Sequence, residues 1–241
     1  MIRARLLRRL PALALMGITL TACTRAVAPD DYFPLQPGHE WRYRVDVEGA
    51  PRPPAGLRVH EVRTLRPIKV DGVDGKVFRR FDTLGNEYHF TRSDTGVERI
   101  GLRNATELEA QRDVPARPVL PTPPKVGSTW QVSTHPFALR RTVPLGGYLS
   151  SQYSIALTMM IEATNDVVTT PAGRFENCLR VVGEGSIELY GDARQGFITV
   201  PITQTEWYAP GVGLVKLLRE EPLEAEIFEG GSIQYELIGY R

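Results

Sequence analysis

The stretch Trp41-Arg42-Tyr43-Arg44-Val45-Asp46-Val47-Glu48 decides the fold class. Its aromatic and branched residues alternate with charged ones at every position, which is typical of a β-strand with one buried face and one solvent-exposed face. One-sided strands of this kind belong to antiparallel sheets. The chain also holds 19 prolines and 22 glycines, which favour short strands and many turns over long helices. We therefore predict an all-β protein with an antiparallel sheet.

The same alternation recurs less strictly elsewhere in the chain. It predicts further strands at residues 57–65, 76–81, 186–190, 196–202 and 233–237. Residues 153–168 are rich in Ile, Leu, Met, Val and Thr, and they form either one long strand or two strands joined at a bend. Short glycine-containing segments predict turns at residues 71–75, 84–86, 94–96, 146–147 and 230–231.

Two segments depart from this pattern. Asn104 and Glu107 have the spacing of a variant capping box, so we predict one minor helix over residues 105–112, ended by Val114-Pro115. Residues 115–124 contain five prolines, which predicts an extended linker that donates poorly to a sheet. The linker separates two possible related halves, 32–114 and 124–241, because each opens with a glycine three residues before a tryptophan.

The amino terminus predicts export. Residues 1–22 combine a basic start with an apolar run that is too short to cross a bilayer as a helix, so they are a signal peptide. The run ends in Leu20-Thr21-Ala22-Cys23, which resembles the lipobox of bacterial lipoproteins. That resemblance implies cleavage before Cys23, acylation of Cys23 and anchoring in the membrane. The alternative is an ordinary secretory peptide with an incidental cysteine. Because Thr24 replaces the aspartate that retains enterobacterial lipoproteins in the inner membrane, the resemblance points to the outer membrane, facing the periplasm.

Cleavage and lipidation set the domain plan. Residues 23–31 are a short lipidated tether, and residues 32–241 form a single β-rich domain. With Cys23 acylated, Cys178 is the only thiol left, so the domain has no internal disulfide. Apolar neighbours on both sides predict that Cys178 is buried and inert.

Charge and motif spacing exclude several function classes. The 29 basic and 28 acidic residues nearly balance, and four of the arginines lie in the signal peptide, so nothing favours nucleic-acid binding. The four histidines have no metal-site spacing, and the acidic turn at 71–75 lacks the ligand number of a calcium loop. No serine lies in a nucleophile elbow, and no glycine run has the spacing of a phosphate loop. Acidic pairs such as Glu220-Glu221 indicate a charged turn near Pro222. We therefore predict no catalytic residues, no metal and no cofactor.

Three further segments are residues 33–43 (FPLQPGHEWRY), 170–181 (TPAGRFENCLRV) and 206–216 (EWYAPGVGLVK). Together they resemble a family of exported bacterial proteins, the domain of unknown function 3108 and its relatives. The resemblance implies a strongly curved antiparallel sheet or an incomplete, half-open β-barrel, with no established enzyme activity. In physical terms the three segments suggest architecture, with tryptophans that anchor strands to a core.

Three functions remain open from the sequence. The first is a non-catalytic envelope lipoprotein that binds or helps to assemble another envelope component. The second is a carrier or sensor of an apolar, lipid-like ligand held in the half-open barrel, lined by aromatic residues and the Met159-Met160 pair. The third is a cell-envelope hydrolase with an unfamiliar site, in which the fold brings two acids together or a histidine beside a serine.

Overall fold

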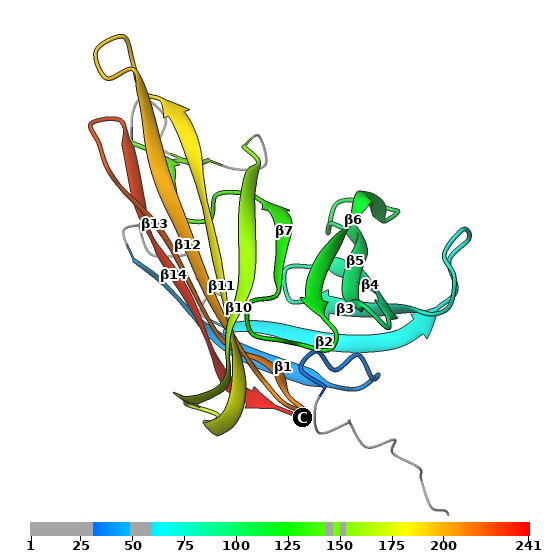
Figure 1. The fold of residues 1–241 in the computed structure, drawn as a ribbon. Coiled ribbons are helices and arrows are strands. Elements are labelled where there is room, and N and C mark those ends of the chain that lie inside the picture. Colours follow the sequence, from blue (N-terminus) through cyan, green and yellow to red (C-terminus); the bar gives the residue numbers. More distant parts are fainter. Residues whose placement is uncertain (1–30, 49–58, 143–146, 150–152) are drawn as a thin grey trace, which may run out of the picture.

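The computed structural model describes residues 31–48, 59–142, 147–149 and 153–241, and these form an all-β protein (Figure 1). The stretch that predicted the fold class is strand β1 (Glu40–Glu48). Trp41, Tyr43 and Val45 are buried on one face of β1, while the arginines between them are exposed. None of the described residues belongs to a helix that could span a bilayer.

Every strand pairing is antiparallel, as predicted. The remaining strands are β2 (Val59–Ile68), β3 (Val77–Asp82), β4 (Glu87–Ser93), β5 (Gly96–Arg103), β6 (Gln111–Pro121), β7 (Thr129–Thr134), β8 (Arg140–Arg141), β9 (Gly147–Tyr148), β10 (Ile155–Thr170), β11 (Gly173–Tyr190), β12 (Phe197–Ala209), β13 (Gly213–Glu224) and β14 (Phe228–Tyr240). The predicted turns at 71–75, 84–86 and 94–96 join β2 through β5.

One sheet carries the whole fold. Its strand order is β6-β5-β4-β3-β2-β1-β14-β13-β12-β11-β10-β7, with β8 and β9 attached beside β14. The sheet has two arms, the first made of β1 to β6 and the second of β14, β13, β12, β11, β10 and β7. It curves so that the two arms face each other, and the edge strands β6 and β7 come together at an unsealed seam (Figure 1). The expected half-open barrel is therefore present, closed everywhere except at this seam.

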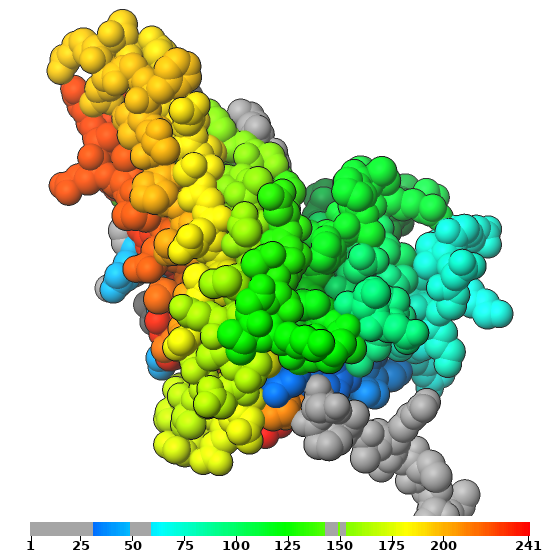
Figure 2. Space-filling model, viewed as in Figure 1, coloured from blue at the N-terminus to red at the C-terminus, as the bar shows by residue number. Residues whose placement is uncertain are grey.

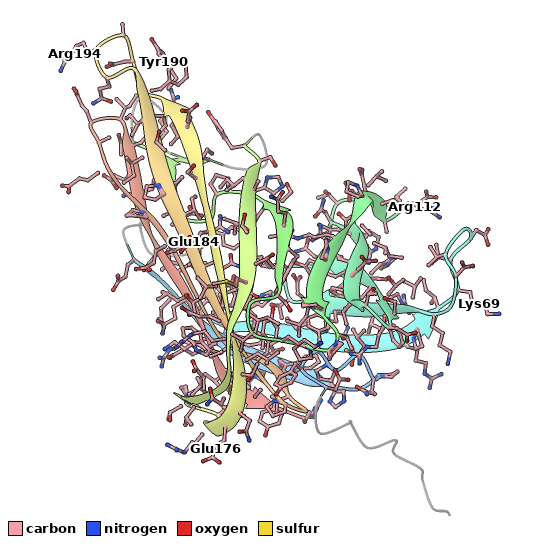
Figure 3. The ribbon with its side chains drawn as sticks, viewed as in Figure 1. Lys69, Arg112, Glu176, Glu184, Tyr190 and Arg194 are labelled. Atoms are coloured by element: carbon pink, nitrogen blue, oxygen red, sulfur yellow. The ribbon has the colours of Figure 1, made fainter. Side chains whose placement is uncertain are left out.

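The long strands give the second arm its shape. Residues 155–170 form one strand, β10, whose pairing with β11 shifts register between Ile161 and Val168, so the predicted run is a single irregular strand. Strand β11 runs from the turn near Glu176 to Tyr190 at the opposite tip (Figure 3). Extra residues in one strand of a pair bend the ladder and increase its twist, which accounts for part of the curvature.

Side chains from both arms fill the space between them. Phe90, Val97 and Leu120 of the first arm belong to the same buried core as Val132, Leu157, Val181 and Ile202 of the second. A second core lies where the first strand, β1, pairs with the last strand, β14. It contains Trp41, Tyr43, Val168, Phe175, Cys178, Ala209, Val215 and Leu237.

The predicted helix at 105–112 is wrong. The backbone N–H of Asn104 does donate to the Glu107 carboxylate at 3.0 Å, as a capping box requires, but the chain makes only a turn there. Strand β6 already begins at Gln111, because pairing with β5 overrides the local helical preference.

The proline-rich segment is also more than a linker. Residues 111–121 form the edge strand β6 and pair with β5 on one side, so only the expected extended conformation is confirmed. Prolines are tolerated at this position because an edge strand needs a ladder on one side only.

Gly230 and Gly231 do not form the predicted turn but lie inside β14. A Cβ atom built on Gly230 would lie 1.9 Å from the carbonyl oxygen of Glu221 and 2.5 Å from the backbone nitrogen of Leu223. The glycine is therefore needed for the close approach of β13.

The signal peptide 1–22, Cys23 and the tether as far as residue 30 lie outside the described residues, as does Gly146 of the predicted turn at 146–147. The relation between the halves 32–114 and 124–241 stays a prediction. Asp31, which the sequence predicted to end the tether, is buried and accepts a hydrogen bond from the backbone N–H of Phe33.

Gly230→Ala tests the close approach. Because the new methyl group overlaps the β13 backbone, we expect a loss of about 1–3 kcal/mol or more in the free energy of unfolding, measured by urea titration. Gly239→Ala in the same strand is the control, since a Cβ atom added there would meet nothing within 4 Å. Equal effects of the two substitutions would contradict the packing explanation.

Candidate binding site

The three segments that carry the family resemblance meet in the second core. The indole N–H of Trp41 donates to the carbonyl oxygen of Val212 at 2.7 Å, and the Tyr43 hydroxyl donates to that of Leu214 at 2.9 Å. Phe175 and Cys178 of the middle segment pack against the same core. The segments are therefore architectural, as predicted.

The two predicted anchoring tryptophans differ in burial. Trp41 is buried, whereas Trp207 is half-buried and donates from its indole N–H to Asp166 at 3.2 Å. Cys178 is fully buried, as predicted. Its burial, with a smaller effect of the negative charge of Asp166, raises the pKa of the thiol to about 11. The thiol is therefore protonated at neutral pH, which makes it a poor nucleophile.

The described residues show the partners of the candidate catalytic groups. The His135 ring is hydrogen-bonded to the carbonyl oxygen of Tyr153, and the His89 ring is hydrogen-bonded to the Glu87 carboxylate. The Ser133 hydroxyl is hydrogen-bonded to the Ser154 hydroxyl. In the described part of the chain, no hydrogen bond joins a histidine ring to a serine or cysteine, and no group of three or more His, Cys, Asp or Glu side chains could hold a metal ion.

A buried ion pair lies inside the sheet, and the sequence did not reveal it. Arg219 and Glu221 on β13 are both fully buried, and their side chains meet at 2.6 Å. The interpretation of Glu220-Glu221 as a charged turn is therefore wrong, because both residues lie within a strand. Burial lowers the pKa of Arg219, whereas the Glu221 carboxylate opposes that shift.

This ion pair fixes the segment that follows β7. The Glu221 carboxylate accepts hydrogen bonds from the backbone N–H groups of Phe137, Ala138 and Leu139 at 2.8–3.0 Å. The Arg219 guanidinium donates to the carbonyl oxygen of His135 at 3.0 Å. The ion pair therefore supplies this segment with the hydrogen-bond partners that a neighbouring strand would otherwise provide.

A chain of polar groups continues from Arg219 along the inner face of β12. Arg219 donates to the Gln204 side chain at 2.9 Å, and Gln204 donates in turn to the Glu206 carboxylate at 2.6 Å. The Tyr208 hydroxyl donates to the other Glu206 oxygen, also at 2.6 Å. Burial raises the pKa of Glu206, although these hydrogen bonds act in the opposite direction. A carboxylate thus lies inside the barrel, facing the arm that carries β6.

A groove lies at the seam, and its lining residue Arg117 is influenced by the charge of Glu206. It has a volume of about 340 Å³ and is lined by Arg99 of β5, residues 113–118 of β6, residues 131–133 of β7, and His135. In Figure 2 the surface is indented between the two arms of the sheet. Val114 on the rim is 88% exposed.

Arg117 is the distinctive residue of this groove. It lies directly opposite Arg99 in the β5–β6 ladder. The Asp113 carboxylate binds Arg99 through two hydrogen bonds, at 2.7 and 2.8 Å. The Arg117 guanidinium makes no hydrogen bond or ion pair with any described residue and interacts with Glu206 and Asp113 only through their longer-range charge. Burial, and then repulsion by Arg99, lower the pKa of Arg117.

Two further grooves have arginines that already contact other side chains. One, of about 300 Å³ along β1 to β3, is bridged by an ion pair between Arg42 and Glu61, and its Arg63 lies over the Phe81 ring. The other, of about 210 Å³, lies where residues 120–124 meet the start of the domain, and there Arg92 is bonded to Asp31. The seam groove is therefore the one we take as the candidate binding site.

Comparisons with known proteins show a distant likeness of fold. No family model matches the chain, and no curated protein matches it, so the resemblance to the domain of unknown function 3108 stays a prediction. One similar solved structure is a "putative lipoprotein" from Parabacteroides distasonis, with 13% identity and a TM-score of 0.44. Another is a "putative exported protein with YmcC-like fold" from Bacteroides fragilis, with 16% identity and a TM-score of 0.42. Each alignment covers 87% of this chain and 98% of the other.

Glu221→Ala tests the buried ion pair. Removing the carboxylate leaves the Arg219 charge buried and three backbone N–H groups without an acceptor, so we expect a loss of roughly 3–5 kcal/mol in the free energy of unfolding. Glu220→Ala, at the exposed neighbouring position, is expected to change it by less than about 0.5 kcal/mol. Chemical denaturation, monitored by tryptophan fluorescence, measures the free energy of unfolding of both variants. A loss of similar size in the two would contradict the structural role of the ion pair.

Proposed function

We propose that this chain is an exported lipoprotein of the bacterial cell envelope that binds another envelope component and catalyses no reaction. Acylated Cys23 attaches it to the outer membrane, and the domain of residues 32–241 faces the periplasm. The observation that carries the binding role is the seam groove, where the sheet leaves two strand edges unpaired and one arginine without a bonded partner among the described residues.

The lipid anchor is supported by the sequence alone. The lipobox-like run Leu20-Thr21-Ala22-Cys23 follows a basic and then an apolar stretch. Each buried CH₂ group of an acyl chain contributes about 0.8 kcal/mol, so two or three chains hold a protein on the membrane without help from the polypeptide. A tether of residues 23–31 then connects the anchor to the folded domain.

The described interior favours binding at the seam over transport of an apolar ligand. Buried side chains from both arms share one core in the place where such a ligand would lie. The two methionines that were expected to line a pocket lie in different environments, since Met159 packs into that core and Met160 is 38% exposed. The carrier function therefore remains the second candidate, without an observation of its own.

Cys23→Ser tests the anchor. We expect the variant to lose labelled palmitate and to leave the membrane fraction when cells are fractionated, because the thioether can no longer form. Cys178→Ala is the control, since its thiol is buried in the domain, and it should remain labelled and membrane-bound. A Cys23→Ser protein that still sediments with membranes would refute lipid anchoring.

Photo-crosslinking in intact cells tests binding at the seam. A benzophenone amino acid at Val114, on the rim of the groove, is expected to form a crosslinked product on illumination. The control is the same amino acid at Leu108, which is 98% exposed and lies outside the groove lining. Products of equal yield at both positions, or none at Val114, would argue against the seam as the binding surface.

A further inference from the structure

The free edge of β7 and the unbound guanidinium of Arg117 lie at the same groove. We infer that the seam takes up an extended peptide segment of a partner protein, which adds a strand to β7 and places a carboxylate against Arg117. This inference rests on the proposed binding function and names the kind of partner it requires.

The first step concerns the backbone. Strand β7 ends the sheet and pairs with β10 on one side, so its other side carries N–H and C=O groups without a ladder partner in the described part of the chain. An added strand would satisfy these groups, as in other complexes in which a peptide extends a sheet. The side chains of Gln131 and Ser133 project beside that edge and can contact alternate residues of the peptide.

The second step concerns why β6 does not close the seam itself. Pro115, Pro118 and Pro121 supply no backbone N–H, so a full ladder between β6 and β7 cannot form. The prolines protect β6 from pairing but leave β7 available. An occupant is thus expected to use β7 for its main-chain hydrogen bonds and the exposed Val114 and Pro115 for apolar contact.

The third step concerns charge. Arg99 and Arg117 face each other across the ladder, and like charges directly opposite each other destabilise a sheet. Asp113 neutralises Arg99 by its two hydrogen bonds, but no described residue does the same for Arg117. A carboxylate in the groove would bind Arg117 and remove that repulsion. An acidic side chain or a carboxyl terminus supplies this group equally well.

Selection from phage-displayed random octapeptides provides the test, with the purified full chain in detergent as bait. We expect enriched sequences with strand-forming residues and with Asp, Glu or the free carboxyl terminus at a fixed position. Selection on Arg117→Gln should lose the acidic position, and selection on Arg117→Lys should keep it. Arg174→Gln is the matched control, because Arg174 is an exposed arginine of β11 remote from the groove lining, and it should leave the selection unchanged.

Synthetic peptides then separate the two parts of the inference. Replacing the enriched acid by its amide should weaken binding about tenfold to a hundredfold in the wild type and have no effect in Arg117→Gln, as measured by fluorescence anisotropy. N-methylation of alternate amides should weaken binding by a similar factor, because it removes the hydrogen bonds to β7. Circular dichroism and the urea midpoint confirm that Arg117→Gln is folded.

Several results would overturn the inference. They are enrichment without an acidic position, enrichment that persists on Arg117→Gln, full competition by acetate at the peptide's own concentration, or no loss on N-methylation. Dimers of the domain that disappear on Ser133→Pro would show instead that a second copy occupies β7. If crosslinking at Val114 succeeds while the peptide selection enriches nothing, the strand addition is wrong and the proposed function stands.

Discussion

The pairing of the first strand with the last is the constraint on which the rest of the structure depends. Strand β1 lies beside β14, and the indole of Trp41 and the hydroxyl of Tyr43 bind carbonyl oxygens at the start of β13. These contacts join residues 171 positions apart in the chain. They turn two arms, each made of sequential antiparallel strands, into one curved sheet. A contact between such distant residues carries a large loop-closure cost, which accounts for the large aromatic area concentrated there.

Once that joint is made, the position of the seam follows. The sheet can close only where its two remaining edges meet, and these edges are β6 and β7. The prolines of β6 prevent an ordinary ladder at that place, so the barrel keeps one opening in a fixed position. An unpaired edge is usually an aggregation hazard, and prolines and charges are common protections against it. Protection explains the prolines, but it does not explain a second arginine placed opposite Arg99.

The sequence predicts this fold well wherever one face of a strand is dry. The alternation over residues 41–48 gave the correct fold class because the pattern is local. Gly230 misled the prediction because its role depends on the carbonyl oxygen of Glu221, which local sequence does not place. Glu221 misled it for a similar reason, since an acid buried against a distant loop has the same local pattern as an exposed one. Arg117 could have been singled out only with knowledge of the β5–β6 register, so nothing in the sequence marked the candidate site.

The buried ion pair and the seam are parts of one arrangement. Burying Arg219 and Glu221 requires both charges to leave water, and an apolar pair of similar size is often as stable. What an apolar pair lacks is the ability to bind backbone groups, and here the two side chains bind the segment from His135 to Leu139, directly after β7. The segment directly after β7 is therefore held by side chains, which fixes the end of β7 in place. A strand edge fixed in advance loses less conformational entropy when a peptide pairs with it, so the ion pair favours binding at the groove, whose lining residue His135 it holds in place.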